Sequence, residues 1–513
     1  MKLNVKRTVL VGFAFMLISL FWQMYDGIMG KMLVDTFGFN QTWSGVVLAL
    51  DNILALILLP VFGLLSDRTN TKLGRRTPYI IIGTIVAAIL IVGVGIFDFY
   101  QYQAVQAHGI GPVVEVESGD APLYNFLVND VHYFTTGVAD KGEVSMVRSA
   151  LVFKEVTKAN PTYLVFFILI LLVVLVAMSS FRTPAVSLMP DVTPKPLRSK
   201  ANAVINLMGT VGGIISLGYM TFLTNETSSI FADYRYVPAI VATSIIMLIM
   251  LAVFLSTVRE RKWVEDMRKI SLQYDLAVEE EFVEPEKGKK PHHKMPKDVR
   301  KSFILILSSV VLWFMAYNAA TSKFALYATN VLDQKTFTLP LIVAYATAFV
   351  AFVPIGFIST KFGRRKTILA GIIILTVAFL LAIFAGPRTA FLMYITMGTA
   401  GIGWATINVN SYPMVVELST EENVGVYTGY YYSASMSAQI VTPILSGLIM
   451  DLVGSYRPLF YYCTVFSALA FVTMFFVKHG DAKKIDTPKL AAETTSNESV
   501  IVEEVTADEP IDE

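Results

Sequence analysis

The chain contains few charged residues and almost no cysteine. Asp, Glu, Lys and Arg make up 16% of its 513 residues, whereas a soluble protein carries about a quarter. The one cysteine, Cys463, excludes an internal disulfide and lies in an apolar run, which favours a packing role. The net charge of +1 argues against a nucleic-acid partner.

Motifs of common enzyme and cofactor sites are also missing from the sequence. No phosphate-binding loop with its lysine follows a strand, no nucleophile–base set is visible, and no metal-ligand spacing occurs. We therefore expect neither an enzyme nor a bound cofactor or metal.

Long apolar runs are abundant. Hydrophobic residues make up 54% of the chain and the mean hydropathy is +0.58. Twelve runs approach or exceed the roughly 20 residues that a membrane-spanning helix needs. They cover residues 8–31, 42–65, 77–97, 163–189, 199–223, 237–258, 303–328, 337–358, 367–385, 390–412, 425–450 and 458–477. The sequence predicts an all-α membrane protein with 12 transmembrane helices.

A short charged connection between two apolar runs, 63–80, is called the hinge below. Its cations predict that it faces the cytoplasm, because short loops rich in Lys and Arg stay on that side. A weaker copy of the hinge lies between two later runs, at 356–366, which indicates a duplicated domain. Other cationic loops fall on the same side, so both termini are expected in the cytoplasm of a cell-membrane protein.

Five segments follow from this pattern. Residues 1–258 form a first six-helix bundle, which includes an external loop at 98–161, and residues 302–478 form a second bundle. Residues 259–301 are a cytoplasmic linker whose start can form an amphipathic helix along the membrane. Alternation at 144–156 suggests a small hairpin in the external loop. The acidic tail, 479–513, is expected to be disordered.

The hinge and two later blocks carry a family resemblance. Ser66-Asp67-Arg68 is followed by Gly74-Arg75-Arg76, and further blocks include Pro190-Asp191 and Tyr412-Pro413 with Glu417. The chain resembles the major facilitator superfamily, and more closely its sucrose/proton symporters and their glycoside–pentoside–hexuronide relatives. The resemblance implies two pseudo-symmetric six-helix bundles that take up a disaccharide or other glycoside by alternating access.

Two departures from that family bear on the coupling ion. Thr360 stands where the superfamily pattern prefers Asp, and Leu59 stands where melibiose-type relatives carry a carboxylate. Asp51, the carboxylate within the second apolar run, lies about two turns deeper. This position favours proton coupling over sodium coupling.

Few charged residues lie deep in the apolar runs, and each costs about 2.5–3.5 kcal/mol to insert. Asp26, Asp51 and Arg182 are such residues. A carboxylate that faces an arginine can exchange that partner for a proton, and the resemblance implies that Arg182 bears on sugar and proton binding. The alternative for each is a structural ion pair or a helix-end position. Lys323 is expected close enough to the outer surface to reach it.

Aromatic and amide side chains near these charges are candidates for sugar contacts, because a sugar stacks its apolar face on a ring and bonds its hydroxyls to polar groups. The candidates are Trp22, Gln23, Tyr25, Asn52, Asn202, Asn206, Tyr317, Asn318, Tyr431 and Gln439. For each, simple helix packing is the alternative.

The two hinges are expected to form a cytoplasmic gate. Asp67 can bond to a helix in the other half, and the hinge arginines can bind carboxylates near Asp191 or Glu417. Such contacts would break when the carrier faces inward; the alternative is that the arginines only fix topology. The expected gate residues are Gly63, Ser66, Asp67, Arg68, Gly74, Arg75, Arg76, Asp191, Arg198, Gly356, Gly363, Arg364, Arg365 and Glu417.

The sequence thus favours a proton-coupled glycoside carrier that acts as a monomer, with a sugar, protons and membrane lipids as its partners. A carrier or exporter of another small solute remains an alternative, because the fold supports many solutes. A transporter-like membrane sensor, signalling through its linker or tail, is an alternative from a different class.

Overall fold

The computed structural model describes residues 3–116, 123–133, 140–194, 197–224, 234–273, 296–334, 336–418 and 424–480. Within these ranges the chain forms twelve helices of 18 residues or more. They are α1 (Val5–Lys31), α2 (Gln41–Arg68), α3 (Thr77–Ala107), α5 (Thr162–Val192), α6 (Arg198–Leu223), α7 (Val237–Thr257), α9 (Lys297–Asn330), α10 (Thr338–Phe362), α11 (Arg364–Ala382), α12 (Leu392–Val416), α13 (Val424–Val453) and α14 (Pro458–Phe475).

The apolar composition of these helices fits a membrane. Among the described residues, 10 spans are long and apolar enough to cross one, and α10 adds a shorter apolar stretch, Thr338–Phe352. The predicted all-α membrane architecture is therefore confirmed, apart from one small sheet. Helix ends differ from the expected ones by several residues; α3 continues to Ala107, ten residues beyond its predicted end.

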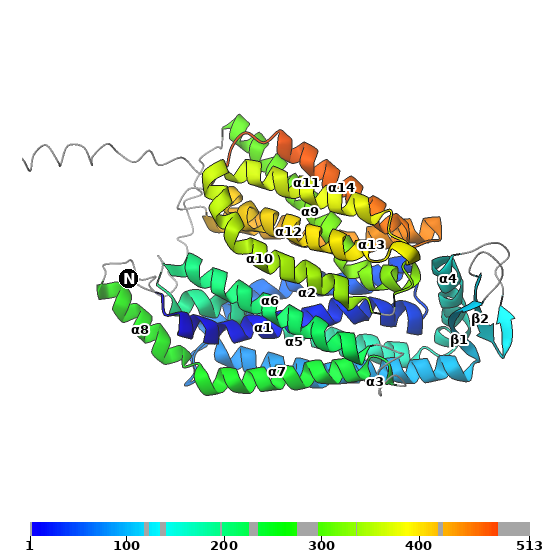
Figure 1. Cartoon of the computed structure of the whole chain (residues 1–513). Coiled ribbons are helices and arrows are strands. Elements are labelled where there is room, and N and C mark those ends of the chain that lie inside the picture. The colour runs from blue at the N-terminus through cyan, green and yellow to red at the C-terminus, as the bar shows by residue number, and fades with distance from the viewer. Residues whose placement is uncertain are drawn as a thin grey trace, which may run out of the picture.

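The long helices form two halves, α1 to α7 and α9 to α14, which lie side by side (Figure 1). Packed pairs of the first half recur in the second. α1 packs on α6 and α7, as α9 packs on α13 and α14. α3 packs on α5 and α7, as α11 packs on α12 and α14, and α2–α5 corresponds to α10–α12. The same six-helix packing thus occurs twice.

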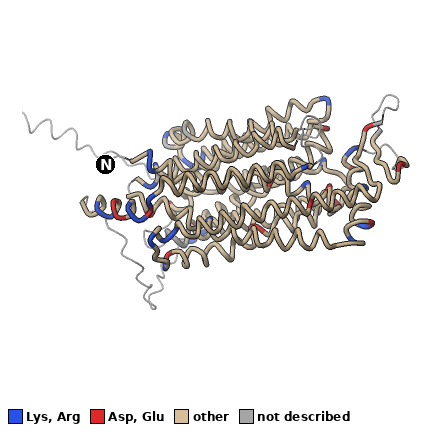
Figure 2. Tube along the Cα trace, turned by 90° about the horizontal axis from the view of Figure 1, so that it is seen from below, with Lys and Arg blue, Asp and Glu red and all other residues tan. Residues whose placement is uncertain are grey.

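The two ends of the molecule differ in charge. One end, called the hinge end, holds the α2–α3 and α10–α11 connections, the N-terminus and α8 (Glu260–Gln273), as Figure 1 shows. In Figure 2, cationic residues gather on α8 and the neighbouring connections at this end, while the long helices between the ends carry little charge. The opposite end, called the sheet end, carries the only sheet of the described chain.

The sheet end holds a small domain inserted between α3 and α5. Strands β1 (Ile110–Val116), β2 (Leu123–Val128) and β3 (Val131–Tyr133) pair antiparallel in that order. Helix α4 (Lys141–Val152) packs on them through a cluster that includes Val105, Phe126 and Val144. The loop at 98–161 therefore does hold a hairpin, formed by β1 and β2.

The predicted location of that hairpin was wrong. The stretch 144–156 is mostly helical, because α4 covers its first part and a π-helical turn (Phe153–Thr157) follows. Its buried positions within α4 recur every three to four residues rather than every two; they are Val144, Ser145, Arg148, Ser149 and Val152. That spacing gives one buried face on a helix.

The linker begins with α8, which coincides with the start predicted to be helical. Trp263 of α8 is buried, and Arg7 of α1 lies over its ring at 5.3 Å and donates to Asp266 at 2.8 Å. The linker beyond residue 273 and the acidic tail beyond residue 480 mostly lie outside the described residues, and the expected disorder of the tail with them.

Candidate functional site

A cavity of about 440 Å³ lies between the two halves. Its lining comes from α1, α2, α5 and α6 of the first half and from α9, α10, α12 and α13 of the second. Because these are equivalent helices of the duplicated arrangement, the cavity lies where the halves face each other. This position makes it the candidate site.

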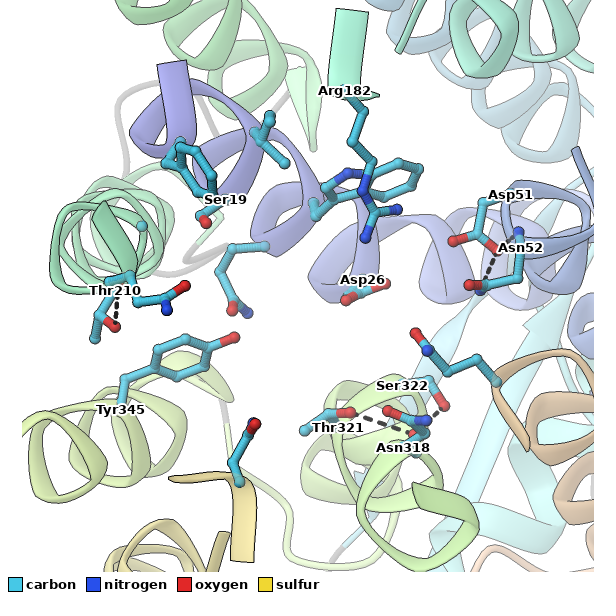
Figure 3. Close-up of a pocket in the computed structure, with 18 of the residues that line it drawn as sticks. Ser19, Asp26, Asp51, Asn52, Arg182, Thr210, Asn318, Thr321, Ser322 and Tyr345 are labelled. Carbon is cyan, nitrogen blue, oxygen red and sulfur yellow. Dashed lines mark hydrogen bonds between the residues drawn. The ribbon is translucent and has the colours of Figure 1, made fainter. Parts of the chain in front are cut away.

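Three acidic or basic residues line this cavity: Asp26 of α1, Asp51 of α2 and Arg182 of α5. Figure 3 shows the guanidinium of Arg182 directed between the two carboxylates. Among the described residues, no hydrogen bond or salt bridge joins any two of the three. The Arg182 guanidinium instead lies over the Trp22 ring, 5.8 Å from its centroid.

The two carboxylates differ in their surroundings. Asp51 Oδ1 accepts hydrogen bonds from the backbone N–H of Asn52 at 2.6 Å and from its side-chain amide at 2.7 Å. Asp26 has no hydrogen-bond or ion-pair partner within the described parts of the chain. Asp51 is therefore held by its neighbour, whereas Asp26 lies at the cavity without such a contact among the described residues.

Unpaired donors also face this region. Trp22 Nε1 and Asn318 Nδ2 are buried and find no partner among the described residues, although both residues line the cavity. A buried donor without a partner costs about 1–3 kcal/mol. A ligand with acceptor oxygens would remove that cost.

Most of the predicted contact residues do line the cavity: Asp26, Asp51, Arg182, Trp22, Gln23, Asn52, Asn206, Asn318 and Gln439. Four others lie elsewhere. Tyr25 is buried and stacks with Phe21, and Tyr317 stacks on Trp404 at 4.0 Å between ring centroids. Tyr431 bonds to Ser411 at 2.9 Å, and Asn202 of α6 is exposed outside the lining.

Sequence reasoning missed several lining residues, namely Ser19, Thr210, Thr321, Ser322 and Tyr345. Thr321 and Ser322 follow Asn318 by three and four residues, so helical spacing placed them on the same face. Tyr345 lies in an apolar run with no polar neighbour at that spacing. Only the packing of α10 brings it to the cavity.

The halves meet closely at the sheet end. The Asp451 carboxylate at the end of α13 accepts from the backbone N–H of Gln41 at 2.9 Å and of Thr42 at 2.8 Å. A residue of the second half therefore caps the first turn of α2, in the other half. A Cβ on Gly45 would lie 2.1 Å from the carbonyl oxygen of Pro443, so α2 and α13 touch backbone to backbone.

Lys323 of α9 also contacts α2 at the sheet end. The prediction that its side chain reaches the outer surface was wrong. Its side chain is fully buried. Lys323 Nζ donates to the main-chain oxygen of Gln41 at 3.1 Å and to its side-chain oxygen at 3.2 Å. Although Lys323 lies near the end of α9, α2 covers its side chain, so the side chain does not reach the surface.

The hinge residues of the first half pair with one another. Arg76 forms salt bridges with Asp67 and, at 2.9 Å, with Asp191, while Arg75 reaches Asp191 at 2.7 Å. The Glu260 carboxylate accepts from the backbone N–H groups of Arg75, Arg76 and Thr77 at 2.8–3.2 Å. Glu260 thereby caps α3 and fixes α8 to the hinge.

The second hinge shows the same behaviour. Arg364 pairs with Glu417 at 3.0 Å, and Arg365 donates to the carbonyl of Phe475 at 2.6 Å. Within the described parts of the chain Asp67 does not form the expected bond to the other half, because Arg76 of its own half binds that carboxylate. These hinge contacts hold each half together. Both sets of hinge contacts are present in this conformation, in which the two halves touch at the sheet end.

A sequence model of the Major Facilitator Superfamily matches residues 146–354 and 335–504. The chain belongs to the Major Facilitator Superfamily. It is a multi-pass membrane transporter rather than an enzyme, as the sequence analysis predicted. A second model, described as MFS/sugar transport protein, matches residues 9–106. The closer likeness to sucrose/proton symporters stays a prediction.

Individual relatives are distant. The MFS-type transporter ppzB of Metarhizium majus is 28% identical over 120 residues, which span 23% of this chain and 26% of that relative. The inward-open xylose transporter XylE from E. coli aligns over 96% of this chain and 100% of its own, with a TM-score of 0.60 and 12% identity. The nucleoside transporter NupG aligns over 92% and 98%, with a TM-score of 0.51 and 13% identity. At such identities the structural likeness concerns the fold alone.

Proposed function

We propose that this transporter takes up a disaccharide or another glycoside together with protons. The two halves rock around the central cavity, so that the site faces one side of the membrane at a time. One observation carries the proposal: Asp26, Asp51 and Arg182 share one cavity with Trp22 and several amide and hydroxyl groups. Buried charges inside a membrane bundle mark a solute or proton path.

The cavity suits a sugar in size and in chemistry. Its volume of about 440 Å³ lies within the range of small-molecule sites. The Trp22 ring offers a stacking face, and the unpaired Trp22 Nε1 and Asn318 Nδ2 offer donors to hydroxyl oxygens. Asp26 and Gln439 supply acceptors on opposite halves. A glycoside bound to both halves would favour their closure over the cavity.

The Asp26 carboxylate, which has no hydrogen-bond or ion-pair partner among the described residues, supports proton coupling. When Asp26 is ionised, its charge is attracted to Arg182, which has no salt-bridge partner among the described residues. Protonation of Asp26 removes that charge and turns the group into a hydrogen-bond donor. Because the two protonation states interact differently with each conformation, a proton can shift the balance between them.

The orientation proposed for the carrier places the hinge end in the cytoplasm of the cell, with both termini there. The cationic loops gathered at this end support it (Figure 2). With the halves joined at the sheet end, the conformation would then face inward. In this proposal the gate residues bind one another within each half and keep that half rigid while the two halves move.

Uptake into vesicles tests the proposal. Labelled sucrose and maltose should accumulate when the sheet side is made acidic, and a protonophore should abolish accumulation. Asp26→Asn and Asp51→Asn should lose accumulation, whereas Glu115→Gln, at an exposed position of β1, is the matched control and should keep it. Accumulation that continues without any ion gradient would refute proton coupling.

A carrier or exporter of another small solute is the second candidate. The two carboxylates and one arginine of the lining give a net charge of −1 when all are ionised, which favours a cationic solute. A thermal-shift screen of glycosides against small amines separates the two. The sensor alternative depends on the linker and the tail; deletion of residues 481–513 that leaves uptake intact but alters gene expression would support it.

A further inference from the structure

Helix α4 of the inserted domain is fixed to the first half. Its buried Arg148 donates from Nε to the carbonyl of Gly111 at 2.6 Å and from Nη1 to the carbonyl of Asp35 at 3.0 Å. Gly38, with φ of +71°, lies so close that a Cβ there would meet the backbone of Ser149 and Phe153 at 2.4 Å. The C-terminal part of α4 thus moves with the first half.

The first turn of α4 contacts the second half instead. The Asp140 carboxylate caps α4 by accepting from the N–H of Glu143 at 2.9 Å, and its other oxygen accepts from Arg457 Nε at 2.9 Å. Lys141 forms a salt bridge with Asp333. The bond from Asp140 raises the pKa of Arg457 above its ordinary value.

Close packing accompanies these ion pairs. A Cβ on Gly142 would lie 2.9 Å from the ring of Tyr456, which is fully buried. The Tyr456 hydroxyl in turn accepts from Gln41 Nε2 of the first half at 3.1 Å. The start of α4 therefore contacts the turns that end α9 and connect α13 to α14, both at the sheet end.

We propose that Asp140, Lys141 and Gly142 form a clasp, which holds the two halves together at the sheet end. The inserted domain is rigidly attached to one half and reaches across to the other, so its contacts exist only while the sheet end is closed. The clasp favours the conformation in which solute reaches the cavity from the hinge end. This inference rests on the alternating access of the proposed function.

Two partly exposed ion pairs set the size of the effect. Exposed pairs contribute little each, and together they are expected to change the ratio of the two conformations about twofold to tenfold. Release of the clasp should therefore raise the population that is open at the sheet end without destroying the fold. If opening of the sheet end limits transport, the rate of uptake from the sheet side should also rise.

Cysteine labelling measures that population. In a Cys463→Ser background, Thr338→Cys places a thiol at a buried contact with Thr221 across the halves. A membrane-impermeant maleimide added on the sheet side labels it only when the sheet end opens. Arg457→Gln with Asp333→Asn should raise the labelling rate about twofold to tenfold. Arg388→Gln, an exposed arginine of the same half between α11 and α12, is the matched control and should leave it unchanged.

A second variant approaches the same ion pair from the first half. Asp140→Asn keeps an N-cap for α4 but removes the charge that binds Arg457, and it should also raise labelling. An unchanged rate in both variants, or an equal rise with Arg388→Gln, would overturn the clasp. Because labelling needs neither sugar nor gradient, its outcome is independent of the glycoside assay.

Discussion

The backbone contact between α2 and α13 gives the sharpest test of how the halves close. Gly45 of α2 has no room for a side chain in this conformation: a Cβ would lie 2.1 Å from the Pro443 oxygen, 2.5 Å from its carbonyl carbon and 2.8 Å from Ile444 N. All three are backbone atoms, so no side-chain rotation relieves the clash. Gly45→Ala must therefore push the two helices apart.

The magnitude follows from these distances. Ordinary contact begins at 3.4 Å, so α2 and α13 must separate by about 1.3 Å, and overpacking of this kind costs about 1–3 kcal/mol. The cost applies only where the helices touch, that is, in the conformation closed at the sheet end. The ratio of open to closed molecules should rise by about 5-fold to 150-fold.

Distances between spin labels report the result. Lys158 and Arg388 are exposed at the sheet end, one in each half, and cysteines placed there in a Cys463→Ser background accept the labels. Gly45→Ala should add a longer-distance population that the parent lacks. Gly218→Ala is the control, because a Cβ there meets nothing within 4 Å.

Two results would contradict this reasoning. If Gly45→Ala leaves the distance distribution unchanged while the protein stays folded by circular dichroism, α2 and α13 do not form the closing contact. If Gly218→Ala changes the distribution as much, the effect comes from helix propensity rather than from the clash.

Two further predictions concern the hinge. Gly74→Ala should lower the thermal unfolding temperature strongly, because Gly74 has φ of +120° and a Cβ would lie 2.3 Å from the Glu260 carboxylate. Gly454→Ala is the control and should lower that temperature less, because Gly454 is also left-handed, at +72°, but a Cβ there would lie in open space. Equal shifts of the unfolding temperature in the two variants would refute the steric argument. Arg76→Gln should destabilise the protein by about 1–3 kcal/mol in chemical unfolding, since it removes a buried guanidinium and leaves the partly buried Asp67 without its salt bridge, while Asp191 keeps Arg75. Arg75→Gln, at a side chain with 34% exposure, should cost less, and the reverse order would contradict the assignment.

Much of the site was readable from the sequence because membrane interiors tolerate few charges. Asp26, Asp51 and Arg182 stand out in apolar runs, and all three line the cavity. The tyrosines were harder to assign, since an aromatic ring in a membrane helix packs as readily as it binds. Tyr317 stacks on Trp404, whereas Tyr345, which no pattern marked, lines the cavity.

Partners across the fold could not be read in the same way. Glu260 caps α3 from a position 183 residues after Thr77, and Asp451 caps α2 from the other half, 410 residues after Gln41. A capping residue close in sequence is recognisable by its spacing, as Asn40 is for α2. A cap supplied from a distant segment has no such spacing.

The sequence by itself determined the class of the protein, the number of long helices and the three charged residues of the cavity, because each follows from local hydropathy and the cost of a charge in an apolar run. Tertiary structure decided which end of the molecule is closed, which side chains meet at the cavity and which residues of the second half α4 contacts. Those depend on how the two halves face each other, and no local pattern specifies that.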